Sequence, residues 1–169
     1  PPSCTFKLNT DGSALNNPSK IGGGGILRDD KGEMIYAFTI SLGIDTNNQA
    51  EAQAASHGIQ WCIQHDFRNV VLEVHSELLI KWITSNVNYY IKELQTLISQ
   101  LDYFQCQHTF REANCTANYL SKWSHNFDIT QHYYTFIQLP VAAKGSFLLE
   151  KMGVVNFIRK RLKRIKHPP

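Results

Sequence analysis

Alternating apolar and polar positions predict a group of strands in the first part of the chain. Residues 6–10 alternate as a strand with one buried face does, an Asp-Gly-Ser string follows at 11–13, and residues 14–21 carry turn chemistry. After four consecutive glycines the chain continues with apolar residues at 26–27, a turn at 30–32 and a further apolar stretch at 34–42. Short apolar stretches separated by turn residues are typical of a β-meander.

Farther along the chain, apolar residues recur at the spacing of amphipathic helices. A helix is expected from about Gln49, with Asn47 and Asn48 before it as candidates for its N-cap. The other expected elements are a strand at 69–74, helices near 78–83 and 91–101, a strand at 105–110 and a helix at 115–123. This order predicts an α/β fold with a mixed sheet and helices packed on it. Residues 125–150 are less periodic, and the sequence predicts no element there.

The length and composition suit a single folded domain. The chain has 169 residues, 43% of them apolar, which is enough to bury a core without disulfides or a structural metal. No apolar run approaches the roughly 20 residues of a membrane span, and no basic-then-apolar leader opens the sequence. Cys4, Cys62, Cys106 and Cys115 lie far apart, which favours free thiols in a reducing compartment. We therefore expect a nuclear or cytoplasmic monomer.

The formal charge of +3 is unevenly distributed. Residues 151–169 hold seven basic residues and no acid, which leaves ten basic and fourteen acidic residues in the first 150. In this tail Ile158, Leu162 and Ile165 fall on one helical face, with basic residues on the others. Such a segment can contact phosphates, serve as a nuclear import signal or touch an anionic membrane, or it can be a solvated end without function.

Two acidic residues occupy positions suited to chemistry, and short motifs narrow their interpretation. Asp11 follows the first predicted strand and Glu51 lies early in the first predicted helix; alone, they read as a turn residue and a surface residue. The chain also contains, in order, the strings KLNTDGS (7–13), GGILRD (24–29), TNNQAEA (46–52), VLEVHS (71–76) and REAN (111–114). Together these strings resemble the ribonuclease H family, in its plant, retrotransposon-derived branch.

The resemblance implies a fold, a reaction and a division of the chain. Members have a five-stranded mixed sheet with strands one to three antiparallel, flanked by helices, and they hydrolyse the RNA of RNA–DNA hybrids with two Mg²⁺ ions held by four carboxylates. We therefore divide the chain into a linker end (1–4), a ribonuclease H-like domain (5–124), a C-terminal extension (125–150) and a basic amphipathic tail (151–169). The proline pair at the start resembles the end of a linker, so we expect a longer polypeptide, and the resemblance implies that this is a reverse-transcriptase polyprotein.

Carried over position by position, the first two catalytic carboxylates and metal ligands are Asp11 and Glu51. His75 replaces the third acid in the string EVHS, and Asn118 replaces the fourth in REANCTAN. Imidazole is a poor ligand for Mg²⁺, and the Asn118 amide brings an oxygen without charge. We therefore expect Mg²⁺ binding to be weak or lost, and hydrolysis to be lowered by several orders of magnitude.

Two rescues of the metal site stay open. Glu73 or Glu77 could turn toward a metal ion. Alternatively, His75 together with Asp11 and Glu51 could prefer Mn²⁺ or Zn²⁺. Without either rescue, His75 is a solvated remnant of a decayed site.

Nucleic-acid binding does not need the missing acids. The resemblance assigns Asn47 and Asn48 to the minor groove, where they sense RNA 2′-hydroxyls, although helix capping is a competing role. The bare backbone of Gly24 and Gly25 could approach a groove, or form a glycine-rich loop without a partner. His108 is either a rim contact that helps product release or a half-buried strand histidine. Basic contacts are expected from side chains in the domain and the tail: Arg111, Arg159, Lys160, Arg161, Lys163 and Arg164.

Three hypotheses about function follow. The first is a ribonuclease H-type domain that binds RNA–DNA hybrid or duplex RNA with little or no cleavage. The second is a weakly active hybrid endoribonuclease that uses Asp11 and Glu51. The third is a protein-interaction module of a retroelement polyprotein.

Overall fold

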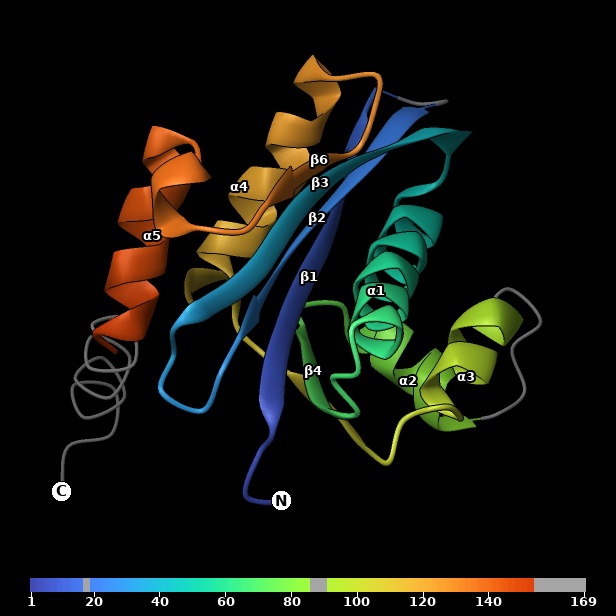
Figure 1. Ribbon diagram of the computed structural model, residues 1–169. Helices are drawn as coiled ribbons and strands as arrows, with labels where there is room; N and C mark the ends of the chain where they lie inside the picture. The colour runs from blue at the N-terminus through green and yellow to red at the C-terminus, as the bar shows by residue number, and fades with distance from the viewer. Residues whose placement is uncertain (17–18, 86–90, 154–169) are drawn as a thin grey trace, which may run out of the picture.

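A computed structural model describes residues 1–16, 19–85 and 91–153, and in it helices cover both faces of one six-stranded mixed sheet (Figure 1). The strands lie in the order β5-β4-β1-β2-β3-β6. Their bounds are β1 Phe6–Leu15, β2 Ser19–Arg28, β3 Met34–Asp45, β4 Asn69–Val74, β5 Tyr103–His108 and β6 Gln131–Tyr133. β1, β2, β3 and β6 pair antiparallel, whereas β4 pairs parallel with both β1 and β5.

The described residues also form α-helices and short 3₁₀ turns. The helices are α1 Asn47–Gln64, α2 Glu77–Ser85, α3 Lys92–Ile98, α4 Cys115–Trp123 and α5 Val141–Lys151. The 3₁₀ turns are Arg111–Ala113, Ser124–Asn126 and Phe136–Gln138. The order of elements through α4 confirms the predicted α/β fold with its mixed sheet. Among the described residues, no helix combines the length and hydropathy needed to cross a membrane.

Two apolar clusters fill the two faces of the sheet. The cluster under α1, α2 and α3 includes Leu8, Ile59 and Leu72, all fully buried. The cluster under α4 and α5 includes Ile26 and Leu120. β2 contributes to both clusters, with Leu27 in the first and Ile26 in the second, and it is buried along almost its whole length. All four cysteines are free.

The sheet has one strand more than predicted. β6 belongs to the C-terminal extension and pairs with β3 from Ala37 opposite Tyr133 to Thr39 opposite Gln131. A strand of three residues is too short to produce a periodic pattern, and it forms here because the edge of β3 offers unpaired backbone groups. The prediction of a five-stranded sheet is therefore wrong by this strand.

β1 continues through residues 11–13, beyond the end near Asp11 that the sequence predicts. These residues pair in antiparallel register with residues 22–24 of β2. The pairing keeps the backbone extended and overrides the local preference of the Asp-Gly-Ser string for a turn. Asp11 therefore lies in the middle of a strand and not at its end.

α1 begins with a cap that differs from the predicted one. Thr46 is the N-cap, and its hydroxyl accepts a hydrogen bond from the backbone N–H of Gln49 at 3.3 Å. The capping role predicted for Asn47 and Asn48 is therefore wrong, because both residues already belong to the helix and are exposed. Glu51 lies one turn farther along, on the buried face of α1.

The glycines of β2 are buried because α1 and α4 lie directly against the strand backbone. A Cβ on Gly24 would lie 2.4 Å from the backbone nitrogen of Ser121 in α4. A Cβ on Gly25 would lie 2.5 Å from the ring of Phe38. Helix and ring thus cover both residues, and the prediction that the backbone of Gly24 and Gly25 approaches a nucleic-acid groove is wrong.

Gly24→Ala is expected to lower the free energy of unfolding by about 3 kcal/mol, because the added methyl meets helix backbone that cannot move aside. Gly145→Ala in α5 is the matched control, since a Cβ there meets nothing within 4 Å. The control should be neutral or slightly stabilising, as alanine favours a helix over glycine. Urea denaturation measures both variants, and equal stabilities would contradict this account of the β2 glycines.

The C-terminal extension is fixed to the domain through buried charges. Arg28 of β2 forms an ion pair with Glu150 of α5, and the two side chains are 9% and 5% exposed. Glu150 also accepts hydrogen bonds from the backbone N–H and the hydroxyl of Thr116, each at 2.9 Å. The Arg28 guanidinium lies over the ring of Phe147, 5.2 Å from its centroid. Because Thr116 is in the first turn of α4, α5 holds the start of that helix in place.

Candidate nucleic-acid cleft

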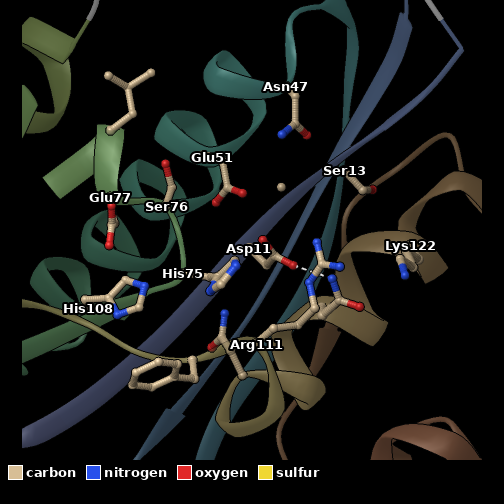
Figure 2. Close-up of a pocket in the computed structure, with 15 residues that line it drawn as sticks. Asp11, Ser13, Asn47, Glu51, His75, Ser76, Glu77, His108, Arg111 and Lys122 are labelled. Atoms are coloured by element: carbon tan, nitrogen blue, oxygen red, sulfur yellow. Dashed lines mark hydrogen bonds between the residues drawn. The ribbon is translucent and has the colours of Figure 1, made fainter.

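A cleft of about 700 Å³ opens where β1, α1, the segment after β4 and α4 meet (Figure 2). Side chains from these four segments converge although the segments are far apart in sequence. β4 lies next to β1 in the sheet, and α1 and α4 cover opposite faces of it. The structure brings together six of the predicted site residues in this cleft: Asp11, Asn47, Glu51, His75, Arg111 and Asn118.

The other predicted binding residues are not in the cleft. Asn48 is exposed in the first turn of α1 but does not line it, and Gly24 and Gly25 are buried in β2. The predicted basic tail contacts lie outside the described residues: Arg159, Lys160, Arg161, Lys163 and Arg164.

Asp11 has a close amide partner. Asn118 Nδ2 donates a hydrogen bond to Asp11 Oδ2 at 2.6 Å, drawn as a dashed line in Figure 2. A carboxylate only accepts hydrogen bonds, so the NH₂ group and not the carbonyl oxygen of Asn118 faces it. The bond therefore places a donor at the position that the family resemblance assigns to a fourth acid.

Glu51 is buried beside Asp11 and is 6% exposed. Burial, and then the charge of Asp11 and a hydrogen bond with it, raise the pKa of Glu51 well above its ordinary value. The backbone of Gly12 and the charge of Arg111 lower it by less. Oε2 of Glu51 is buried without a hydrogen-bond partner. The raised pKa keeps the Glu51 carboxyl protonated at neutral pH, so the pair carries less negative charge than two free acids.

His75 is exposed and turned toward the end of β5. Its Nδ1 donates a hydrogen bond to the carbonyl oxygen of Thr109 at 3.2 Å. The His75 ring lies 5.6 Å from that of His108, measured between centroids, and both line the cleft. The predicted alternative for His108, a half-buried strand histidine, is wrong, because its side chain is exposed at the rim.

The two acids considered as replacement ligands differ in position. Glu73 forms an ion pair with Lys7 at 2.7 Å and accepts a hydrogen bond from Gln107 Nε2 at 3.2 Å. Its carboxylate is therefore engaged away from Asp11, and Glu73 does not line the cleft. Glu77 does line the cleft, from the first turn of α2.

These residues do not fit a pair of Mg²⁺ ions. Within residues 1–16, 19–85 and 91–153, no group of three or more His, Cys, Asp and Glu side chains is placed to hold a metal ion. Two adjacent hard cations need a cluster of anionic oxygens. Here Asp11 accepts a hydrogen bond from the uncharged amide of Asn118, and the imidazole of His75 stands at the third position, so only two of the four acids remain.

Two further polar residues line the cleft and are not among the predicted site residues. Lys122 lines it from α4, four residues after Asn118 and thus on the same helical face, a spacing that the sequence already contained. Asn114 joins the start of α4 to β1: its Nδ2 donates to the carbonyl oxygen of Thr10 at 3.2 Å, and its Oδ1 accepts from Asn9 at 3.1 Å. Only the tertiary structure shows the pairing of Asn114 with β1.

Glu51→Gln is expected to stabilise the domain above neutral pH. A carboxyl group whose pKa is raised by folding contributes stability that is present at low pH and is lost as the pH rises toward the raised value. Glutamine keeps the shape of Glu51 and buries no charge. Urea unfolding at pH 5 and pH 8 should show the variant gaining about 1–2 kcal/mol over the parent between the two values. If the free energies of unfolding of the variant and the parent differ by the same amount at pH 5 and pH 8, the raised pKa of Glu51 is contradicted.

The fold and the cleft together define a ribonuclease H-like domain. The reverse transcriptase-like family matches residues 9–124, which is more than half of the chain, and the chain therefore belongs to this family. The chain is 26% identical over 162 residues to a protein of Arabidopsis thaliana that bears the provisional name of a ribonuclease H protein. That alignment covers 92% of this chain but only 26% of the Arabidopsis protein.

Solved structures support the same fold. Ribonuclease H1 from Halobacterium salinarum has a TM-score of 0.68 at 22% identity, with 72% of this chain and 98% of that one covered. LC11 ribonuclease H1, isolated from compost and solved in complex with an RNA/DNA hybrid, has a TM-score of 0.64 at 22% identity, covering 72% and 96%. The residues after α4 lie outside the family match, so β6 and α5 are additions to the matched region.

Proposed function

We propose that this domain binds RNA–DNA hybrid or duplex RNA in the cleft and does not hydrolyse it with Mg²⁺. The observation that carries the proposal is the hydrogen bond from Asn118 to Asp11, which uses a carboxylate oxygen that a metal ion would need. Family membership supports nucleic acid as the ligand. The substitutions at His75 and Asn118 support the loss of hydrolysis.

The cleft contains two cations that can contact the phosphates of a polyanion, beside the acids Asp11, Glu51 and Glu77. Arg111 and Lys122 are exposed cations that line it, and no ion pair among the described residues engages either of them. The raised pKa of Glu51 lowers the negative charge that the phosphates would meet beside Asp11. Exposed Asn47 supplies an amide at the edge of the cleft that can reach a ribose 2′-hydroxyl.

Fluorescence anisotropy with a labelled RNA–DNA hybrid tests this binding. The double variant Arg111→Ala/Lys122→Ala should lower affinity at least tenfold at low salt and reduce the dependence of affinity on salt concentration. Lys81→Ala/Lys92→Ala, which removes two exposed lysines that do not line the cleft, should leave affinity within about twofold. Equal losses in both double variants would place the binding elsewhere on the surface.

We further propose that the basic tail adds phosphate contacts and that the domain is part of a longer reverse-transcriptase polyprotein. The sequence of residues 151–169 supports the first point, and the short share of the Arabidopsis relative that this chain spans supports the second. Deletion of residues 154–169 should weaken hybrid binding most at low salt, where phosphate contacts contribute most. Unchanged affinity in the truncated protein would remove the tail from the binding surface.

A further inference from the structure

A second group of polar side chains lies outside the cleft, at the edge where β6 pairs with β3. The hydroxyl of Tyr36 in β3 forms hydrogen bonds with His57 Nε2 at 3.1 Å and with His132 Nδ1 at 2.7 Å. His57 comes from α1 and His132 from β6. The sixth strand, which the sequence did not predict, therefore completes the group. None of the three residues lines the nucleic-acid cleft.

The phenol oxygen of Tyr36 lies near each of the two imidazole nitrogens, at a spacing close to that of neighbouring ligands of one metal ion. In a tetrahedral zinc site with bonds of about 2.0–2.1 Å, adjacent ligand atoms lie about 3.3 Å apart. The two nitrogen–oxygen distances, 3.1 and 2.7 Å, are close to this spacing. The rings of His57 and His132 have centroids 6.2 Å apart and are inclined by 31°, so they flank the phenol oxygen.

The donor types suit a borderline transition-metal ion better than a hard one. Imidazole nitrogen binds Zn²⁺ readily and Mg²⁺ poorly. The Tyr36 phenol adds one oxygen to the two imidazole nitrogens, so the set is a mixed nitrogen and oxygen site.

The site has both a rigid floor and an opening. Tyr36 is 1% exposed and stacks on Trp61, with ring centroids 4.0 Å apart. His132 is exposed on the edge strand, which leaves access for an ion and for a water molecule as a further ligand. A metal site with protein ligands on one side and solvent on the other is typical of three-ligand zinc coordination.

We propose that Tyr36, His57 and His132 form a binding site for a divalent transition-metal ion of the Zn²⁺ class, with water as a fourth ligand. The two histidines bind the ion as neutral rings, each with its hydrogen on the nitrogen away from the ion, and the Tyr36 phenol gives up its one proton to solvent as its oxygen binds. Because the ligands come from β3, α1 and β6, a bound ion ties the C-terminal extension to the body of the domain. This site is independent of the proposed nucleic-acid function.

Isothermal titration of the untagged protein with Zn²⁺ tests the proposal, in a Cys4→Ser background that removes an exposed thiol. One Zn²⁺ per chain should bind, and its affinity should fall at least tenfold in His57→Gln and in His132→Gln. Zinc should raise the thermal midpoint of the parent and not of these variants. Mg²⁺ at the same concentration should not raise it. His132 is exposed, so its variant is expected to fold.

His75→Gln/His108→Gln is the matched control, because it removes the other neighbouring pair of histidines. This double variant should bind Zn²⁺ as the parent does. Absence of zinc binding in the parent, loss of binding in the control, or unchanged affinity in His57→Gln and His132→Gln would overturn the proposal. Tyr36→Phe keeps the stacked ring and should weaken zinc binding, and unchanged affinity there would contradict the assignment of the phenol as a ligand.

Discussion

Glu150→Ala is expected to lower the free energy of unfolding by about 3–5 kcal/mol, because it leaves Arg28 buried without its ionic partner. The change also removes the acceptor for the backbone N–H and the hydroxyl of Thr116 at the start of α4. Nε of Arg28 already has no partner, so the guanidinium has little left to offset its burial. Urea unfolding monitored by tryptophan fluorescence measures the loss.

Lys151→Ala provides the control for this prediction, since it breaks an ion pair on the same helix at the surface. The side chains of Lys151 and Glu33 are 34% and 57% exposed, and such pairs contribute less than about 1 kcal/mol. If Glu150→Ala lowers the free energy of unfolding no more than Lys151→Ala does, the contacts of Glu150 with Arg28 and Thr116 do not hold α5 and α4 in place.

The double reversion His75→Asp/Asn118→Asp is expected to raise Mg²⁺-dependent cleavage of an RNA–DNA hybrid by at least about 100-fold, which corresponds to about 2.7 kcal/mol in the barrier. It restores two carboxylates beside Asp11 and Glu51, and it removes the amide that donates to Asp11. Four clustered acids repel one another without a cation. The double variant should therefore have a lower thermal midpoint than the parent in EDTA, and Mg²⁺ should raise it.

Cleavage and the thermal midpoint of the double variant together distinguish a variant that folds but does not bind Mg²⁺ from one that does not fold. Adding Asp11→Asn to the double variant should abolish both the cleavage and the stabilisation by Mg²⁺. A folded double variant that neither cuts nor gains stability with Mg²⁺ would mean that changes beyond positions 75 and 118 prevent metal binding.

The part of the fold that could be predicted is the part with strong periodicity. The spacing of apolar residues located α4 at its observed bounds and found the order of elements up to residue 124. The short strand β6 and the ion pair of Arg28 with Glu150 could not be predicted, because each depends on partners more than 90 residues apart. Local turn chemistry also failed at residues 11–13, where sheet pairing with β2 decided the conformation.

Motif resemblance located the residues of the candidate site, but it could not predict the packing and the pKa values that depend on burial. The strings around Asp11, Glu51, His75 and Asn118 located four residues that the structure brings together in one cleft. The same resemblance could not show that Gly24 lies under α4, because contact between a glycine and a helix is a property of packing. The raised pKa of Glu51 likewise depends on burial, which no motif reports.

Several sequence predictions stay predictions. The monomeric state, the nuclear or cytoplasmic location and the contacts of the basic tail are of this kind. The tail beyond residue 153 lies outside the part of the chain that the structure describes.

The most direct test of the central claim is the cleavage of an end-labelled RNA–DNA hybrid by the unmodified chain in Mg²⁺, compared with its Asp11→Asn variant. We expect the unmodified chain to bind the hybrid and to cleave it no more than Asp11→Asn does. The reason is that Asn118 donates a hydrogen bond to the carboxylate oxygen of Asp11 that a metal ion needs. Robust cutting by the unmodified chain that depends on Mg²⁺ and is lost in Asp11→Asn would contradict it.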